Sequence, residues 1–279
     1  HAVSMDMTAM GTYRNRWLTD EALEILAAEQ GTILDVGGGA APYCRATHIV
    51  DIQPFDAERL EQNRWGREYG SVGVWECGSV PITPIPPYSD TQLLLPWTPS
   101  DYTQLDLCSG QKWPFVDKQF DLGLCSHCLE DLRDPIPVVR ELSRVCKRVL
   151  IIAPSRLLEQ TMNIDHPRYC GFSHHPWMVF VENGTLVFRR KTPVVNLRGC
   201  HLVCPTGMTL KLEHGAIFFH GSDPQAVEQV FWNEHDDHED YRRSIEPFRN
   251  RPDLFEHDGR RHDLTYWVWR LREKYLGVL

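Results

Sequence analysis

Short apolar runs alternate with amphipathic stretches through the first half of the chain. Runs of apolar and β-branched residues at 32–36, 48–51, 102–107, 120–125 and 149–153 predict β-strands. The spacing of apolar residues predicts helices from Thr19 to Gly31 and over 137–146. Strands that alternate with helices are typical of a parallel sheet joined by crossover helices.

After Pro154 the pattern changes, and antiparallel hairpins are expected instead. Asn183-Gly184 is a strong two-residue turn signal, and His214-Gly215 is a second candidate turn. The expected elements are hairpins over 177–191 and 208–220, helices at 224–232 and 261–276, and a solvated acidic helix face at 234–240. This half is expected to complete the sheet with antiparallel strands.

Together the two halves predict an α/β fold with a doubly wound, mostly parallel sheet and an antiparallel C-terminal portion. The core is expected over 5–160, and 161–279 is expected to complete the sheet and cover a substrate. A long insertion at about 65–100 follows the second strand and is rich in Gly, Pro and Trp. Such a segment is typical of a lid, a substrate wall or an oligomer contact, and the alternative is an ordered surface excursion.

Composition narrows the classes of partner. The 279 residues are 42% hydrophobic and 24% charged, which is typical of a globular protein. The net charge of −9 provides no global basic field, so neither nucleic acid nor an anionic membrane is expected as a partner. Without a signal peptide or an apolar run near 18 residues, the nine cysteines are expected to be reduced thiols in a cytoplasmic protein.

Three consecutive glycines follow the first predicted strand directly. Bare backbone at Gly37, Gly38 and Gly39 permits close approach of a ligand, and the next helix N-terminus favours a negative group. Asp51 ends the second predicted strand, where a carboxylate can accept hydrogen bonds from ribose hydroxyls. The pattern predicts an adenosine-type site. A dinucleotide is the competing ligand, but its third glycine would fall at Pro42.

The segment Ile33-Leu34-Asp35-Val36-Gly37-Gly38-Gly39 resembles motif I of class I, Rossmann-like S-adenosylmethionine-dependent methyltransferases. Further matches occur in order over about 18–160: Asp51, Asp106-Leu107, the run from Trp113 to Asp121, Ser126 to Asp131, and Glu141 to Val145. The resemblance implies S-adenosylmethionine as the cofactor and methyl transfer as the reaction.

The resemblance also implies roles for single residues. The three glycines would line the methionine moiety and the ribose, with Asp35 fixing the loop or meeting the amino group. Asp51 would bind the ribose hydroxyls. The remaining implied contacts are Asp106 to the adenine amine, Leu107 against the ring, and Ser126 and His127 near the sulfonium and substrate.

The sequence departs from the family pattern at two places, and the first of them, together with the large unassigned C-terminal half, keeps a second function open. Ala40-Ala41-Pro42 stands where the family often has a third spaced glycine, and Asp131 stands where it commonly has His. The alternative is a methyltransferase-fold protein that binds the cofactor but serves as a partner subunit or a non-methylating enzyme.

A Gly- and Pro-rich loop after the fifth predicted strand concentrates residues suited to substrate recognition and proton transfer. The candidate substrate-binding residues are His166, Arg168, Tyr169 and Trp177, and the candidate general bases are His174, His175 and then His127. The loop also resembles a stretch of methyltransferase-like proteins associated with glycan or secondary-metabolite clusters. The expected acceptor is therefore a small molecule or a glycan, with a homodimer as a further candidate partner. The alternative is that these histidines cap loop carbonyls or pack beside Trp177.

No metal site is expected, although the histidine-rich second half keeps a metal-dependent enzyme open as an alternative. The partial ligand patterns are Cys200-His201-x-x-Cys204, His235-Asp236-Asp237-His238 and Cys125-x-x-Cys128. None of the three forms a complete four-ligand signature.

Overall fold

The computed structural model describes residues 20–39, 42–43, 45–58, 60, 97–231 and 233–257. The chain divides into two compact units. The first comprises the residues up to Cys128 together with Pro137–Ile152 and His220–Asp223. The second comprises Leu129–Ile136, Ala153–Phe219 and the residues from Pro224 onward.

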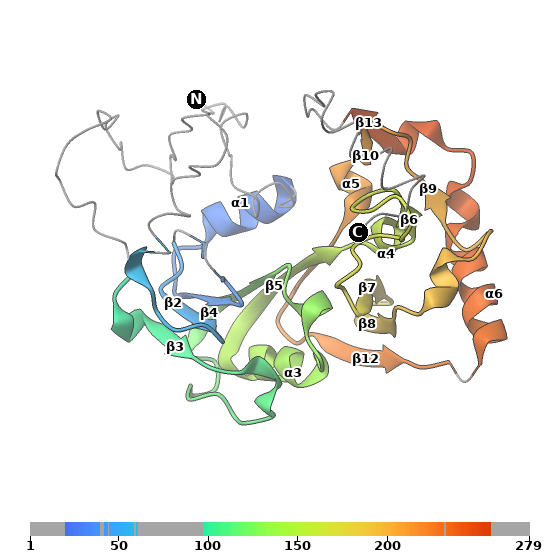
Figure 1. Ribbon diagram of the computed structural model, residues 1–279. Helices are drawn as coiled ribbons and strands as arrows, with labels where there is room; N and C mark the ends of the chain where they lie inside the picture. Colours follow the sequence, from blue (N-terminus) through green and yellow to red (C-terminus); the bar gives the residue numbers. More distant parts are fainter. Residues whose placement is uncertain are drawn as a thin grey trace, which may run out of the picture. The chain divides into compact units, whose positions relative to one another are not determined.

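A six-stranded sheet has the order β11-β5-β4-β1-β2-β3, and its strands β1 to β5 belong mainly to the first unit (Figure 1). The elements of this part of the chain are α1 (Asp20–Ala28), β1 (Ile33–Val36), β2 (His48–Asp51), the 3-10 helix η3 (Pro99–Asp101), β3 (Tyr102–Gln104), the 3-10 helix η4 (Leu107–Ser109), β4 (Phe120–Ser126), α3 (Ile136–Val145) and β5 (Cys146–Pro154). All the strands predicted in the first half are confirmed, as are both helices.

The neighbours of β1 define the point where the strand order reverses. It pairs in parallel with β2 on one side and with β4 on the other. The chain builds β2 and β3 outward in one direction, then returns to place β4 and β5 on the opposite side. In an open sheet of this kind, ligands bind at the carboxyl ends of the strands beside that reversal. The loops after β1, β2 and β4 therefore mark the expected binding edge.

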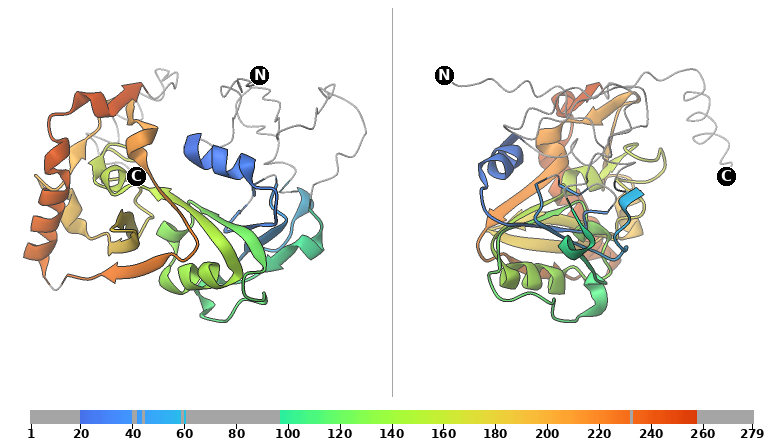
Figure 2. Two further views of the ribbon diagram at one scale, coloured as in Figure 1. Left: turned by 180° about the vertical axis from the view of Figure 1, so that it is seen from behind. Right: turned by 90° about the vertical axis from the view of Figure 1, so that its left-hand side faces the viewer.

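Apolar side chains from both faces of the strands form the core of this unit. Every residue of β1 is buried, because helices cover both faces of the sheet: α1 and α3 lie on opposite faces (Figures 1 and 2). The buried positions of α3 are Val138, Val139, Leu142 and Val145, which are the residues whose spacing predicted the helix. This is the doubly wound α/β architecture expected from the sequence.

The second unit contains a three-stranded sheet, β12-β8-β7, and two pairs of short strands, β6 with β9 and β10 with β13. Its elements are the 3-10 helix η5 (Leu129–Asp131), α4 (Arg156–Glu159), β6 (Thr161–Met162), β7 (Trp177–Glu182), β8 (Thr185–Arg190), the 3-10 helix η6 (Pro193–Asn196), β9 (Leu202–Val203), β10 (Met208–Leu210), α5 (Leu212–Gly215), β12 (Gln225–Gln229), α6 (Glu234–Ile245), the 3-10 helices η7 (Glu246–Phe248) and η8 (Pro252–Leu254), and β13 (Phe255–His257). Strand β11 (Ala216–Gly221) is divided between the two units.

The hairpin predicted around Asn183-Gly184 is confirmed as β7 and β8. The two strands pair antiparallel, with Glu182 opposite Thr185 across the turn. Asn183 and Gly184 have φ values of 51° and 79°, so both turn residues adopt the left-handed region that a two-residue type I′ turn requires.

The hairpin predicted over 208–220 is wrong. Strand β10 pairs antiparallel with β13, so that Leu210 lies opposite Phe255, and a helical turn occupies Leu212–Gly215 in place of a tight β-turn. Strand β11 then takes the edge of the six-stranded sheet beside β5. Both strands thus satisfy their backbone groups with partners distant in sequence, which local alternation of residues cannot reveal.

The helix predicted over 224–232 is also wrong over the part that the structure describes. Gln225–Gln229 form β12, which pairs in parallel with β8 so that Ala226 lies opposite Leu186. The edge of β8 offers this segment a full set of hydrogen-bonding partners. In so short a segment, pairing of this kind outweighs the high helix propensity of Ala, Glu and Gln.

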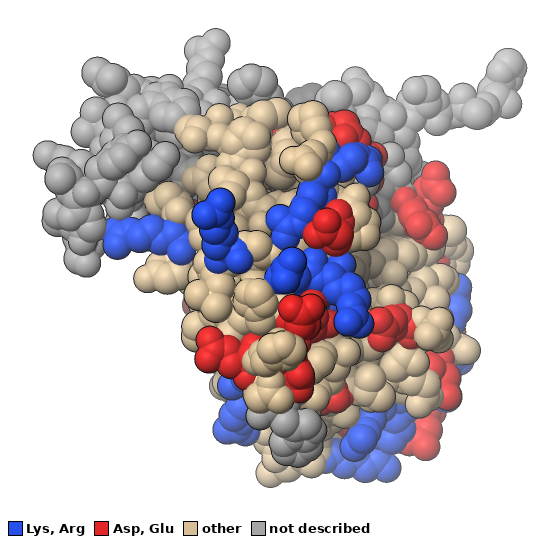
Figure 3. Space-filling model, turned by 90° about the vertical axis from the view of Figure 1, so that its right-hand side faces the viewer, with Lys and Arg blue, Asp and Glu red and all other residues tan. Residues whose placement is uncertain are grey.

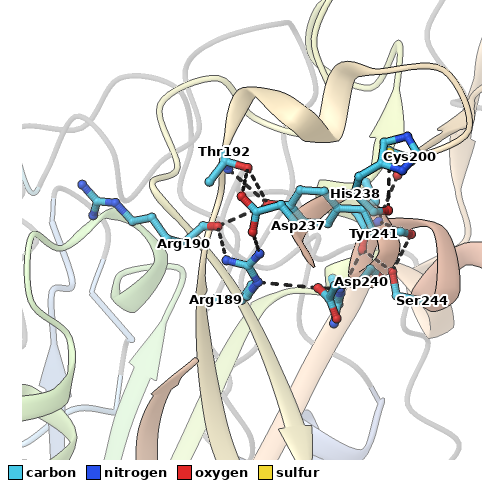
Figure 4. Close-up of polar contacts among 11 residues, drawn as sticks. Arg189, Arg190, Thr192, Cys200, Asp237, His238, Asp240, Tyr241 and Ser244 are labelled. Carbon is cyan, nitrogen blue, oxygen red and sulfur yellow. Dashed lines mark hydrogen bonds and ion pairs between the residues drawn. The ribbon is translucent and has the colours of Figure 1, made fainter. Parts of the chain in front are cut away.

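The acidic run 234–240 is helical, as expected, but it is not simply a solvated face. Asp237 is buried and forms an ion pair with Arg189, whose side chain is 2% exposed (Figure 4). Asp240 pairs with Arg156 and lies 3.5 Å from Nε of Arg189. The buried side of α6 therefore also carries acidic residues, because arginines on β8 and α4 form ion pairs with them.

Two expectations fall outside the described residues. They are the helix at 261–276 and nearly all of the insertion at about 65–100.

On the face drawn in Figure 3, Lys and Arg side chains are interspersed with Asp and Glu.

Candidate functional site

In the glycine loop after β1, Gly37 and Gly39 lack a side chain for different physical reasons. Gly37 has φ +69°, and a Cβ there would fall inside van der Waals contact of Sγ of Cys128 and 2.9 Å from its Cβ. Gly39 has φ +57°, but among the described residues other than its chain neighbours no atom lies within 4 Å of the position that its Cβ would take. Gly37 is thus demanded by packing against the loop after β4, whereas Gly39 faces open space that a ligand can enter.

Two buried carboxylates hold this loop in place. Asp51, at the end of β2, is 5% exposed and accepts hydrogen bonds from the amides of Gly39 at 2.7 Å and Gln53 at 2.9 Å. Asp35, at the centre of β1, is fully buried and accepts one from the amide of Tyr43 at 2.6 Å. Because a carboxylate has about four acceptor positions, Asp51 keeps capacity for donors besides these two amides.

Asp106 and Leu107 follow β3, as the sequence predicted. The carboxylate of Asp106 caps the short 3-10 helix η4 by accepting a hydrogen bond from the amide of Cys108 at 2.9 Å. Asp106 is exposed, while Leu107 is 7% exposed. A polar group and an apolar surface therefore adjoin at the end of β3, which is the pair of properties that a purine ring requires.

Ser126 and His127 end β4 at the same edge of the sheet. Ser126 is buried and lies opposite Ile152 in the parallel ladder with β5. The amide of His127 donates to the carbonyl of Ile152 at 2.9 Å, and its φ of 50° turns the chain out of the strand. The glycine loop, Asp51, Ser126 and His127 thus lie at the carboxyl ends of the neighbouring strands β1, β2 and β4. Asp106 and Leu107 follow the end of β3, which is the next strand beyond β2.

A separate polar cluster lies within the second unit, around His175. Nδ1 of His175 lies 2.7 Å from Oε1 of Glu159, and Nζ of Lys191 lies 2.5 Å from Oε2 of the same carboxylate. Nε2 of His175 lies 3.6 Å from Oδ1 of Asp131, and Nε2 of His174 lies 4.0 Å from that oxygen. His175 and Glu159 are buried, whereas His174 and Asp131 are exposed.

The pKa values within this cluster follow from burial and charge. Burial alone lowers the pKa of His175, but the hydrogen bond to Glu159 and the negative charges of Glu159 and Asp131 outweigh it, so the pKa is raised. The side chain of Asp131 is 46% exposed, and burial of the rest raises the pKa of its carboxyl group, against the opposing effect of His175. The cluster therefore combines a firmly held imidazole with a carboxyl group that takes up protons more readily than usual.

The predicted substrate-binding residues differ in how much of each side chain is exposed to solvent. Tyr169 is 48% exposed, and its ring lies 5.0 Å from that of His166. Arg168 is exposed, and its amide donates to Nδ1 of His166. Trp177 is 4% exposed, because its indole N–H donates to the carbonyl of Leu132 and its ring packs against neighbours of the hairpin. Trp177 fixes the end of the loop, and the other three line its surface.

Residues 92–151 match the family model described as a methyltransferase domain. This segment contains β3, β4, α3 and β5, and so it includes both Asp106 and Ser126. The match covers about a fifth of the 279-residue chain. The order of its sheet, with the reversal beside β1, is the class I, Rossmann-like arrangement.

Several solved structures are similar to part of this chain. An S-adenosylmethionine-dependent methyltransferase from Thermotoga maritima has 15% identity and a TM-score of 0.30, over 49% of this chain and 50% of that one. One from Mesorhizobium loti has 14% identity and a TM-score of 0.30, over 61% and 63%. One from Aquifex aeolicus has 19% identity and a TM-score of 0.29, over 52% and 69%. The alignment thus spans about half the length of the Thermotoga protein.

No curated protein matches the chain in sequence. Among the residues that the structure describes, no helix is both long and apolar enough to cross a membrane.

The three partial metal patterns do not bring their residues together as ligands in the described part of the chain. Sγ of Cys204 donates to the carbonyl of Met208, and Nδ1 of His201 lies 3.0 Å from the carbonyl of Val195. In the acidic run, Asp237 turns inward to Arg189. Cys128 packs beside Gly37 in the first unit. These side chains are occupied by structural contacts.

Sequence reasoning missed Glu159 and Lys191 and gave Asp131 no role. Glu159 follows Leu157 and Leu158 in a short helix, and it is fully buried there. The sequence did contain a signal for Glu159, which is a carboxylate in an apolar turn that follows a buried strand. Such a carboxylate is buried only when a partner compensates its charge. Its partners, His175 and Lys191, are distant in sequence, so the cluster itself becomes visible only in the fold.

Proposed function

We propose that this chain is an S-adenosylmethionine-dependent methyltransferase that acts on a small-molecule or sugar-containing acceptor. The observation that carries the proposal is the hydrogen bond from Gly39 to Asp51 at the carboxyl edge of the sheet, beside the reversal of strand order. The methyltransferase domain matched over 92–151 supports the same reaction class.

The residues at this edge have the chemistry that the cofactor requires. The open space at Gly39 accommodates a ligand that a side chain would displace, and Asp51 retains acceptor positions for ribose hydroxyls. We assign Gly37, Gly38 and Gly39 to the methionine and ribose side of the site. Asp35 fixes the loop or meets the amino group, Asp106 meets the adenine amine, Leu107 packs on the ring, and Ser126 and His127 face the reacting end.

Bound S-adenosylmethionine supplies an electrophilic methyl group on a sulfonium, which an acceptor displaces in line. The task of the protein is to hold the acceptor in line with that methyl group and to exclude water. The loop bearing His166, Arg168 and Tyr169 is assigned to the acceptor. A histidine, from among His174, His175 and His127, assists removal of the proton from an acceptor hydroxyl or amine. Of the three, His174 exposes the most, 62% of its side chain.

Calorimetry with S-adenosylmethionine and S-adenosylhomocysteine tests the proposal. Both ligands are expected to bind the unmodified chain, and Asp51→Ala is expected to weaken binding by at least about tenfold through loss of charge-assisted hydrogen bonds. Asp117→Ala is the matched control, because Asp117 is an exposed carboxylate that caps no part of the glycine loop. Circular dichroism verifies that both variants fold. Failure of the unmodified chain to bind either ligand overturns the proposal.

A chain that binds the cofactor without methylating is the second candidate, because Ala40-Ala41-Pro42 stands where the methyltransferase family often has a third spaced glycine. The measurement is release of S-adenosylhomocysteine with a panel of hydroxyl- and sugar-bearing compounds. Binding of the cofactor without turnover on any member of the panel favours this second candidate.

A further inference from the structure

Three donor atoms of the second unit converge on one small volume. Oδ1 of Asp131 and the imidazole nitrogens of His174 and His175 all lie within 4.8 Å of one another. Nε2 of His175 is 3.6 Å from the carboxylate oxygen, and Nε2 of His174 is 4.0 Å from it. These separations are too long for hydrogen bonds.

The separations suit donors that share an ion. Zinc binds imidazole nitrogen and carboxylate oxygen at about 2.0–2.2 Å in a tetrahedron, which places the ligand atoms about 3.4 Å apart. The donors of Asp131, His174 and His175 need to move together only slightly to reach that spacing. Asp131 and His174 are exposed, so their side chains have room to make this adjustment.

Glu159 orients the buried imidazole for this task. With Nδ1 of His175 engaged by the Glu159 carboxylate at 2.7 Å, the other nitrogen, Nε2, faces Asp131. Lys191 holds the second oxygen of Glu159 at 2.5 Å, so the carboxylate cannot turn away. A carboxylate that accepts the remaining ring N–H is the usual support of a metal-binding histidine, since it fixes the tautomer and raises the basicity of the ligand nitrogen.

We propose that Asp131, His174 and His175 bind one divalent transition-metal ion, for which Zn²⁺ is the natural probe. Two nitrogens and one carboxylate oxygen form the donor set of open zinc sites, in which the fourth position takes water or an oxygen of a ligand. The ligand class is therefore a molecule that offers a hydroxyl or carboxylate oxygen. This inference goes beyond methyl transfer and does not depend on it.

An ion at this site has a consequence for the chemistry of the cluster. A metal ion lowers the pKa of a bound water to about 7, and it acts on a bound hydroxyl in the same sense. The histidines would then promote loss of a proton through the metal rather than by accepting the proton themselves.

Metal titration of the full chain tests the proposal. Protein freed of metal with a chelator is dialysed against Zn²⁺, and bound metal is measured by elemental analysis. About one ion per chain is expected. Asp131→Asn and His174→Ala are each expected to weaken binding by at least about tenfold, because each removes one ligand of three. Both positions are exposed, so both variants are expected to fold.

The matched control is His235→Ala. His235 is 82% exposed and lies 3.6 Å from Asp236, so it reproduces a surface His–Asp pair outside the cluster. Its affinity for Zn²⁺ is expected to equal that of the unmodified chain. Replacing Zn²⁺ with Co²⁺ distinguishes His and Asp ligands from Cys ligands. Nitrogen and oxygen ligands give no thiolate-to-cobalt charge-transfer band, whereas a cysteine thiolate does.

Four outcomes overturn the site. They are absence of bound metal in the unmodified chain, unchanged affinity in both ligand variants, equal loss of affinity in His235→Ala, and a thiolate charge-transfer band. Cofactor binding is measured separately, so that failure of this proposal and failure of the methyltransferase proposal remain distinguishable.

Discussion

Gly37 lies so close to Cys128 that only glycine fits at position 37. A Cβ there would be 2.9 Å from the Cβ of Cys128 and closer still to its sulfur. This contact ties the loop after β1 to the loop after β4 at the edge where the cofactor is proposed to bind. Gly39, two residues on, shares the positive φ but faces open space.

Gly37→Ala is therefore expected to cost more stability than Gly39→Ala. A left-handed conformation costs a non-glycine residue about 1–2 kcal/mol, and overpacking adds about 1–3 kcal/mol at position 37 alone. Urea unfolding, followed by circular dichroism, measures both free energies. Equal losses in the two variants would show that the contact with Cys128 does not set the requirement for glycine.

The buried ion pair between Arg189 and Asp237 is expected to matter far more than a surface pair. Arg189→Met leaves the Asp237 carboxylate buried without its main partner, which costs about 3–5 kcal/mol of unfolding free energy. Arg251→Met, which breaks the exposed pair with Asp253, is the control and is expected to cost less than about 1 kcal/mol.

The double variant Arg189→Met, Asp237→Leu is expected to recover part of that loss, because two apolar residues leave no uncompensated charge. Chemical denaturation of the three variants provides the comparison. A double variant less stable than Arg189→Met would contradict the argument that an unpaired charge is the main cost.

Asp121 gives the stability of the first unit a defined pH dependence. A hydrogen bond from Lys147 and two from Thr32 hold the pKa of Asp121 far below its usual value. Because the pKa is lower in the folded state, the stabilisation is present above the unfolded-state pKa of about 3.9 and is lost as the pH falls below it.

The test compares the unmodified chain with Asp121→Asn. The difference between their melting temperatures is expected to be largest near pH 6 and to shrink toward pH 3. Lys112→Ala serves as a control for general loss of surface charge. A difference that stays constant over this range would show that ionised Asp121 does not stabilise the fold.

The cysteines are expected to differ sharply in reactivity. Burial raises the pKa of both Cys146 and Cys170 to about 12, so almost none of either thiol is ionised at pH 9. Cys108 is half-buried near the surface. Maleimide labelling with peptide mapping is expected to modify Cys108 in the folded chain, and Cys146 and Cys170 only after denaturant is added. Labelling of Cys170 at pH 9 without denaturant would refute this.

Secondary structure was predictable where local sequence carries its own signal. The alternation of apolar runs and helical spacing located β1, β2, β4, β5 and α3, because a strand buried on both faces is mainly apolar. Asn183-Gly184 located its hairpin, because only residues tolerant of positive φ form that turn.

The errors arose where the pairing partner is distant. Segments 208–220 and 224–232 have weak local preferences, and their structure follows from open strand edges at β5, β8 and β13. The burial of Asp237 was missed for the same reason, because it depends on an ion pair with Arg189 from another part of the chain.

Local strand, turn and helix signals located the glycine loop after β1, Asp51 at the end of β2 and the alternation of strands with helices, because each signal acts over neighbouring residues. Which glycine is held by packing, and which faces open space, depends instead on the contacts of the folded chain. The tertiary structure also decided that Asp131, His174, His175 and Glu159 form one cluster. Distances between side chains far apart in sequence depend on how the chain closes on itself, and no local pattern contains them.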